Sequence, residues 1–193
     1  MKTFDSSETH IETDIHPLFK KRWSPRAFSE KEIPEELLNE IFTAASWAAS
    51  SMNEQPWHYI YATSGTEGFQ KLWSCLNTNN QIWTKNVPVL FAAFYHKNYR
   101  RNDRPNRVAM HDLGMANAHL LLQATSKDIY GHLMGGFDAE KLVESLKTAD
   151  DLVPVAMGVL GYHGDPDQLE EPFRTREREP RTRRNLDEFV VKI

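Results

Sequence analysis

The stretch Ala49-Ser-Ser-Met-Asn-Glu-Gln-Pro-Trp57 joins two segments whose apolar residues follow different periods. Before it, between residues 34 and 49, apolar side chains recur at the three- and four-residue spacing of one helix face. The side chains that form this pattern are Leu37, Leu38, Ile41, Phe42 and Ala45. After it, the run from Trp57 to Thr63 is aromatic and β-prone. The sequence therefore predicts a helix over 34–49 and a strand over 57–63, joined by a polar loop.

Helical patterns and short apolar runs continue to alternate as far as residue 162. The further predicted elements are a helix ending near Leu76, a strand at 87–95, a helix at 108–124, a helix capped by Asp138 and a strand at 153–162. This mixture of helices and strands predicts an α/β sandwich.

The composition indicates one domain and narrows the classes of partner. A chain of 193 residues, 40% of them hydrophobic, can bury one core, so we expect a single domain over 1–193 with a loose arm at 1–16. A net charge of −4 gives no general attraction to nucleic acid, and no apolar run reaches the roughly 18 residues that span a bilayer. The single cysteine, Cys75, rules out an internal disulfide and favours a cytoplasmic location.

The closing segment, residues 164–193, differs from the rest of the chain. It is rich in charge and proline up to residue 185, and this part is not expected to bury itself. Its last few residues are apolar and strand-prone. We therefore expect an extended tail whose end packs on a partner surface, most simply a second copy of the chain.

Several common catalytic motifs are missing from the sequence. It contains no GxGxxG fingerprint, no phosphate-binding GK[ST] loop, no GxSxG elbow and no HExxH pair. His111 and Asp112 are adjacent on a predicted helix, but a structural role suits them better than a metal site. We therefore predict no bound metal.

Basic residues gather near both ends of the chain. They are Lys20, Lys21, Arg22 and Arg26 at the start, and Arg174, Arg176, Arg178, Arg181, Arg183 and Arg184 at the end. Such clusters are often solvated charge, but arginine also binds phosphate through paired hydrogen bonds. The segment Leu133-Met-Gly-Gly-Phe-Asp138 places two glycines before a helix start, where backbone N–H groups favour an electron-rich ligand or form an ordinary turn.

Read in order, five segments together resemble the FMN-dependent nitroreductase family. They are KRWSPRAF at 21–28, ASSMNEQPWHY at 49–59, NNQIWTKNVPVLFAA at 79–93, GHLMGGFDAEK at 131–141 and PRTRRNLDEFV at 180–190. The resemblance implies a mainly antiparallel central sheet flanked by helices, and a homodimer with FMN at its interface. It also implies that the C-terminal strand is exchanged with the dimer partner.

The resemblance also assigns cofactor-binding roles to individual residues of this chain. Those implied to bind FMN are Arg22, Trp23, Ser24, Arg26, Ser50, Ser51, Asn53, Asn80, Leu133, Met134, Gly135, Gly136, Arg181 and Arg183. Ser50, Ser51 and Asn53 are implied to reach the flavin of the neighbouring subunit. Arg22, Ser24 and Arg26 are implied to hold the flavin phosphate and ring, and Arg183, followed by Arg181, to bind the phosphate. The chain departs from some relatives at Trp83, where they have lysine, and at Gly135, where they have an acidic residue.

The function implied is electron transfer from NADH or NADPH, through FMN, to a small acceptor such as a nitroaromatic, a quinone or an activated alkene. The flavin would perform the chemistry in a ping-pong mechanism, so no catalytic side chain is needed. Tyr99 and Arg100, in the segment 95–107, either shape the acceptor pocket or belong to a solvated loop. Two other hypotheses stay open: a flavin store or sensor without turnover, and a flavin-free scaffold that binds a protein or nucleic acid.

Overall fold

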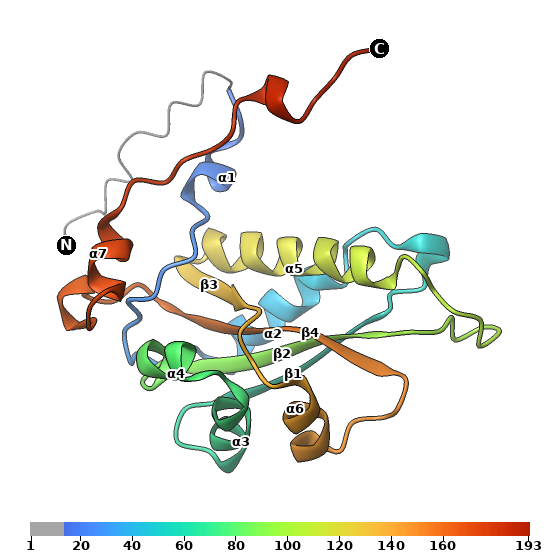
Figure 1. Cartoon of the computed structure of the whole chain (residues 1–193), viewed down its shortest axis with the longest axis horizontal. Coiled ribbons are helices and arrows are strands. Elements are labelled where there is room, and N and C mark those ends of the chain that lie inside the picture. Colours follow the sequence, from blue (N-terminus) through green and yellow to red (C-terminus); the bar gives the residue numbers. More distant parts are fainter. Residues whose placement is uncertain (1–13) are drawn as a thin grey trace.

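A computed structural model describes residues 14–193, and a four-stranded antiparallel sheet lies at its centre (Figure 1). The strands in spatial order are β1 (Trp57–Thr63), β2 (Val89–His96), β4 (Leu152–Tyr162) and β3 (Ile129–Met134). Each neighbouring pair is antiparallel, which confirms the predicted sheet. Residues 1–13, most of the predicted N-terminal arm, lie outside the described part of the chain.

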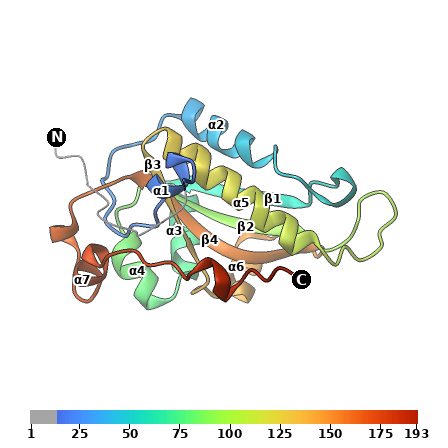
Figure 2. The same cartoon turned by 90° about the horizontal axis from the view of Figure 1, so that it is seen from above.

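Helices cover both faces of this sheet (Figures 1 and 2). α2 (Glu35–Ala45) and α5 (Ala109–Ser126) lie on one face, and they also pack against each other. α3 (Glu67–Cys75) and α6 (Ala139–Leu146) lie on the opposite face. The core therefore consists of two apolar layers separated by the sheet.

Strand β2 connects the two layers because both of its faces are buried. Val89, Phe91 and Ala93 face the α2–α5 layer, whereas Leu90, Ala92 and Phe94 face the α3–α6 layer. Alternating directions of successive side chains in a strand produce this division. A strand covered on both faces reads as one continuous apolar run, which is why it was predictable from sequence.

The predicted boundaries agree with the structure except at a few ends. Strand β1 occupies the predicted residues 57–63, and Asp138 caps α6 by accepting a hydrogen bond from the Lys141 backbone at 2.9 Å. The helix predicted over 34–49 ends at Ala45. Beyond it the backbone tightens into three-residue turns, in which Ser46 N–H donates to the Thr43 carbonyl at 3.0 Å.

Strand β3 and several short segments were not predicted. The short segments are α1 (Pro17–Lys21), α4 (Thr78–Thr84), α7 (Phe173–Arg178) and the 3₁₀ turns η1 (Ser51–Asn53), η2 (Pro166–Gln168) and η3 (Leu186–Glu188). Strand β3 is a six-residue edge strand with Gly131 in its interior, and glycine weakens the sequence signal for a strand.

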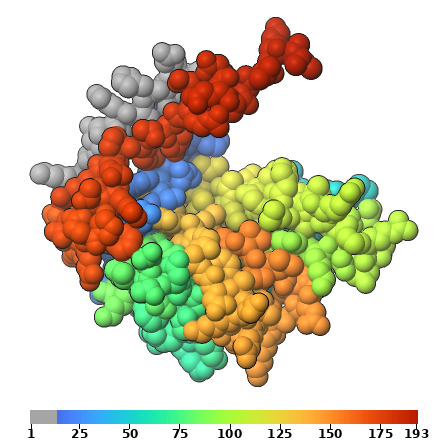
Figure 3. Space-filling model, viewed as in Figure 1, coloured from blue at the N-terminus to red at the C-terminus, as the bar shows by residue number. Residues whose placement is uncertain are grey.

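Most of the charged part of the C-terminal segment is exposed or half-buried, so the expectation that it stays unburied is wrong at two residues only. Phe173 and Glu177 of α7 are both buried against the body of the protein. Beyond α7 the chain leaves that body, and Phe189–Ile193 are exposed (Figure 3). Exchange of a C-terminal strand with a partner stays a prediction. Among residues 14–193, no helix is both long and apolar enough to span a bilayer.

Candidate functional site

Arg22, Arg181 and Arg183 form an arginine cluster where the two ends of the chain meet. Arg181 donates hydrogen bonds to the backbone carbonyls of Arg22 at 2.8 Å and of Lys20 at 2.7 Å. Arg22 donates to the Ser24 hydroxyl at 3.2 Å. Burial lowers the pKa of Arg22, and the nearby guanidinium groups of Arg183 and Arg181 lower it further.

Within the described residues, no carboxylate lies within ion-pair distance of these three guanidinium groups. Like charges held this close together repel one another, so a bound anion would stabilise the cluster. Phosphate is well suited because the planar guanidinium group donates two parallel hydrogen bonds to its oxygens. The arginine cluster is therefore a candidate anion site.

Glu177 fixes the backbone that follows this cluster. Glu177 is 2% exposed, and its carboxylate accepts the Arg26 backbone N–H at 2.8 and 3.0 Å and the Ala27 N–H at 2.9 Å. The Trp23 ring lies close by, with its centroid 5.3 Å from the ring of His163. Helix α7 thus ties the C-terminal segment to the predicted basic motif at 21–28.

The Arg26 side chain lies beside aromatic rings. Its guanidinium carbon is 6.0 Å from the ring centroids of both Trp83 and Phe173. Trp83 is buried, and its ring is also 4.8 Å from that of His132. Arg26 therefore places a positive charge beside the buried ring of Trp83.

Asn80 and Gly136, 56 residues apart in sequence, are joined directly. The Asn80 amide nitrogen donates to the Gly136 carbonyl at 2.9 Å, and the amide oxygen accepts from Trp83 Nε1 at 3.3 Å. A donor on one side and an acceptor on the other permit only one orientation of this amide. Trp83 therefore positions Asn80.

The segment at 133–136 is where β3 ends. The Met134 side chain is in the core, so any contact of Met134 with a ligand would be through its backbone. A Cβ on Gly135 would meet nothing within 4 Å, so open space adjoins that backbone. Leu133, half-buried, pairs with Gly158 of β4.

The predicted residues Ser50, Ser51 and Asn53 lie in and next to η1. The Ser50 hydroxyl accepts the Gln55 backbone N–H at 3.0 Å, and the Ser51 backbone N–H donates to Asp112 at 3.0 Å. Asn53 is exposed and has a φ of 55°, in the left-handed region. Asp112, adjacent to His111, is 3% exposed and anchors this turn.

Helix α5 separates η1 from the arginine cluster within one chain. Asp112, in its first turn, binds Ser51, whereas Lys21 pairs with Asp128 just beyond its last turn. The 14 residue steps from Asp112 to Ser126 span roughly 21 Å at about 1.5 Å per residue. Figures 1 and 2 show helix α7 and the segment that joins α2 to β1, which carries η1, on opposite sides of the molecule. The structure thus unites Arg22, Arg26, Asn80 and Gly136 at one end and leaves Ser50–Asn53 at the other.

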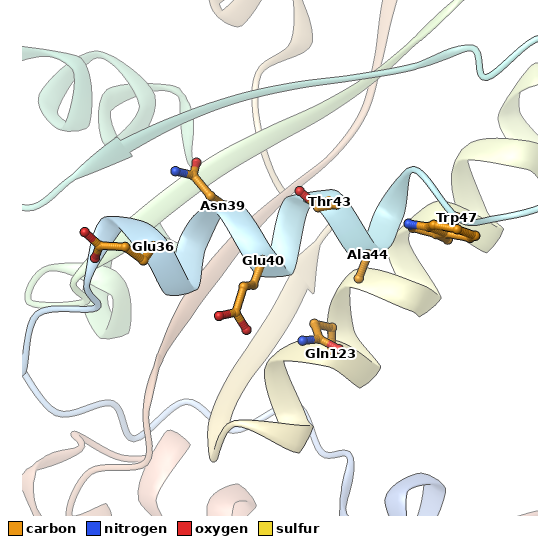
Figure 4. Close-up of a pocket in the computed structure, with 7 residues that line it drawn as sticks. All are labelled: Glu36, Asn39, Glu40, Thr43, Ala44, Trp47 and Gln123. Carbon is orange, nitrogen blue, oxygen red and sulfur yellow. The ribbon is translucent and has the colours of Figure 1, made fainter.

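A shallow depression on the outer face of α2 is distinct from both groups (Figure 4). The residues that line it are Glu36, Asn39, Glu40, Thr43, Ala44 and Trp47 from α2 and the turn after it, and Gln123 from α5. Trp47 is 80% exposed. None of the predicted flavin residues lines this depression.

An antiparallel sheet covered on both faces by helices, with a candidate anion site where the chain ends meet, defines the class of this protein as α+β. The family model described as "Nitroreductase family" matches residues 19–75 and 66–162. The chain belongs to the nitroreductase family, as its sequence motifs indicated.

Individual relatives agree with this assignment. A protein of Stenotrophomonas maltophilia, provisionally named an NADH dehydrogenase/NAD(P)H nitroreductase, is 25% identical over 170 residues, 79% of this chain and 86% of that protein. A crystal structure described as an oxidoreductase containing FMN has a TM-score of 0.91 and 30% identity, and the match covers 100% of this chain and 97% of that one. A nitroreductase–FMN complex from Exiguobacterium sibiricum shares the fold, with a TM-score of 0.76 and 20% identity over 94% of this chain and 98% of that one.

Three residues that position either the region around the arginine cluster or the turn η1 were not identified from sequence. Glu177 belongs to a charge-rich run in which nothing marks the one buried carboxylate. His132 donates to the Pro25 carbonyl at 2.8 Å, a contact between segments 107 residues apart. Asp112 was considered only beside His111. A helical-periodicity signal was available for Asp112, because it lies three residues after Ala109 and four before Ala116, both of which are buried on the same face of α5.

Proposed function

We propose that this chain is an FMN-dependent oxidoreductase that takes electrons from NADH or NADPH and delivers them to a small organic acceptor. The observation that carries the proposal is the arginine cluster, which has no carboxylate partner among the described residues. The relative that is 30% identical over the whole chain and is described as containing FMN supports it further.

The chain has residues that suit both the phosphate end and the ring end of FMN. Arg22, Arg181 and Arg183 suit the phosphate, which needs several donors and compensating charge. Open space at Gly135 suits a flat ring placed against the backbone, with Asn80 beside it. When bound, FMN would accept a hydride from the nicotinamide and pass electrons to the acceptor in a ping-pong sequence.

The chain's own residues would orient the flavin and adjust the charge around it. Asn80, held in one orientation by Trp83 and Gly136, keeps one amide hydrogen for a ligand acceptor. Arg26 would place a positive charge near the ring system, where it stabilises developing negative charge. No side-chain nucleophile is needed, which agrees with the missing catalytic motifs.

We further propose that two chains form the site, with Ser50, Ser51 and Asn53 supplied to the partner's flavin. Large apolar residues are exposed around η1, an unusual feature for a free surface. They are Trp47, Met52, Val108 and Met110. A second copy that covers them would bring its η1 towards the arginine cluster, and the exposed Phe189–Ile193 would pair with its sheet. The single buried cysteine, Cys75, agrees with a cytoplasmic protein.

A visible spectrum followed by an anaerobic titration tests the proposal. We expect the purified protein to show flavin absorbance that NADH or NADPH bleaches and a quinone restores. Coloured protein that neither donor bleaches would favour a flavin store or sensor. Colourless protein that ignores added FMN would contradict the proposal altogether.

Arg26→Ala is the matching variant. We expect FMN to dissociate at least about tenfold more readily, since a charge-assisted contact contributes roughly 1.5 to 3 kcal/mol. Lys71→Ala, which removes an exposed cation of α3, is the control and should retain FMN. Full flavin occupancy of Arg26→Ala after extensive dialysis would show that Arg26 has no such role.

A further inference from the structure

The connection between β2 and α5, residues 97–107, is an ordered and strongly basic loop. It folds back on itself, since Tyr99 N–H donates to the Arg104 carbonyl and Asn106 N–H to the Lys97 carbonyl, both at 2.8 Å. An isolated bridge between Asn98 and Pro105 closes it. We call these residues the 97–107 loop. It projects from the same end of the molecule as η1 (Figures 1 and 2).

The 97–107 loop concentrates positive charge in a chain whose net charge is −4. Its exposed cations are Lys97, Arg100, Arg101, Arg104 and Arg107, against a single acidic residue, Asp103. Among the described residues, none of the four arginines lies within ion-pair distance of a carboxylate. Such a cluster repels itself and favours an external anion.

Two carboxylates in and beside the loop are engaged by other donors. Asp103 accepts a hydrogen bond from the Asn98 side chain at 2.9 Å. Glu54 accepts the backbone N–H of Arg100 at 2.6 Å, not its guanidinium group. These contacts order the loop while they leave its guanidinium groups facing solvent, so the acidic residues support the loop without neutralising the arginines.

The 97–107 loop is attached to the turn that we propose to serve the partner's flavin. The Tyr99 hydroxyl lies 3.2 Å from that of Ser51, and Glu54 follows η1 directly. Arg101 lies over the Tyr99 ring at 5.1 Å. If Ser51 reaches a flavin, the arginines of this loop therefore stand at the outer edge of the same pocket.

We propose that the 97–107 loop binds the 2′-phosphate of NADPH and makes this enzyme prefer NADPH to NADH. The inference rests on the proposed function and narrows its electron donor. The nicotinamide must contact the flavin, and the 2′-phosphate lies on the adenosine half, at the far end of the dinucleotide. A loop that projects from the edge of the pocket lies where the adenosine half would extend. Arginine is also the residue that accommodates a 2′-phosphate in other nucleotide sites.

The test compares wild-type holoprotein with Arg100→Ser/Arg101→Ser, with the Arg100→Lys/Arg101→Lys pair, and with Lys71→Ala as the control. We expect the ratio of kcat/KM for NADPH to that for NADH to fall at least about tenfold in the serine pair. The lysine pair should recover part of the ratio because it retains the charge but not the planar fork. The control should keep the wild-type ratio.

A binding measurement makes the test independent of turnover. Calorimetry on FMN-loaded wild type should show tighter binding of 2′,5′-ADP than of 5′-ADP, and the serine pair should lose this difference. If the wild-type flavin is not bleached by either donor, the proposed function fails, and this binding arm alone decides the role of the loop.

Three results would overturn the inference. One is an equal fall for both donors, which would indicate a structural effect through Ser51. Another is an unchanged donor ratio together with equal binding of the two nucleotides. The third is a serine pair in which the donor ratio is unchanged and only the ratio of kcat/KM for the anionic acceptor 4-nitrobenzoate to that for uncharged nitrobenzene falls. The loop would then recognise an anionic acceptor and not the donor.

Discussion

A predicted ligand-binding segment lies near each end of helix α5, and in each segment a buried carboxylate holds the backbone through hydrogen bonds. At one end the buried carboxylate of Glu177 accepts the backbone N–H groups of Arg26 and Ala27. At the other end the buried carboxylate of Asp112 accepts the backbone N–H of Ser51. In both cases a carboxylate distant in sequence fixes the backbone of the motif.

The two regions differ in how many segments of the chain converge there and in how far they are buried. Around Glu177 the segments 22–28, 80–83, 132–136 and 177–181 converge, and much of that region is buried. Around Asp112 the turn is exposed and surrounded by exposed apolar residues, including Met52 and Met110. This difference supports our proposal that the first end holds most of one flavin and that the second completes the flavin site of another chain.

Glu177→Ala should have the largest effect. It leaves the buried backbone N–H of Ala27 and the partly buried N–H of Arg26 without an acceptor, at about 1 to 3 kcal/mol for the buried group and less for the other, so the free energy of unfolding should fall by roughly 3 kcal/mol. FMN affinity should fall as well, because Arg26 loses its fixed backbone. Urea unfolding and flavin fluorescence titration, at one chain concentration, measure the two effects.

Glu177→Gln is the matched variant at this position. It keeps one oxygen acceptor and should lose only part of the stability. Unchanged unfolding in Glu177→Ala would show that the clamp on residues 26–27 is unimportant.

Asp112→Ala should have a smaller effect on unfolding, roughly 1 kcal/mol, because the Ser51 N–H that it exposes is only half-buried and can bond to water. FMN retention should nevertheless decrease if η1 serves the flavin. Asp112→Asn keeps an acceptor oxygen and should retain more FMN. A loss of stability in Asp112→Ala as large as that of Glu177→Ala would remove the distinction between the two ends.

Acidification should produce the smallest effect, and His132 beside Arg26 contributes to it. Burial lowers the pKa of His132, and Arg26 lowers it further, against the opposing hydrogen bond to the Pro25 carbonyl. The unfolded chain takes up this proton near pH 6.5 and the folded chain only at lower pH. Stability should therefore decrease as the pH falls below about 6.5, because the unfolded state then binds more protons.

His132→Gln keeps a donor for Pro25 but cannot titrate. Its unfolding free energy should therefore depend less on pH than that of the wild type between pH 5 and 7. The pH dependence of urea unfolding measures this difference. Identical slopes for the two proteins would show that His132 is not the titrating group.

Residues with strong periodicity or continuous burial made most of the fold predictable. Leu38 and Ile41 on α2, and the run through Phe91 on β2, identified their elements because burial acts on many neighbouring positions together. Strand β3 was not predicted, because its backbone is held extended by pairing with β4, for example between Leu133 and Gly158. Pairing partners distant in sequence leave little local pattern.

The sequence identified the segments that form the candidate site, but it did not show which of their residues contact one another. The motifs named Asn80 and Gly136 separately, whereas only the structure shows their hydrogen bond. Glu177 was missed because its burial results from the docking of α7, and a charge-rich run such as Arg174-Thr-Arg-Glu-Arg178 reads as solvated. Long-range packing thus determines which charged residues have structural roles.

A complementation experiment tests the central claim that one flavin contacts groups from two chains. One parent carries Arg22→Ala/Arg181→Ala and the other Ser50→Ala/Asn53→Ala, and both should bind FMN poorly as homodimers. Co-expressed with two different tags, the mixed dimer contains one site with every native group and one site with every substitution. FMN content after tandem purification should therefore approach one flavin per mixed dimer. A mixed dimer with no more FMN than its parents would contradict the account, because both groups would then act within a single chain.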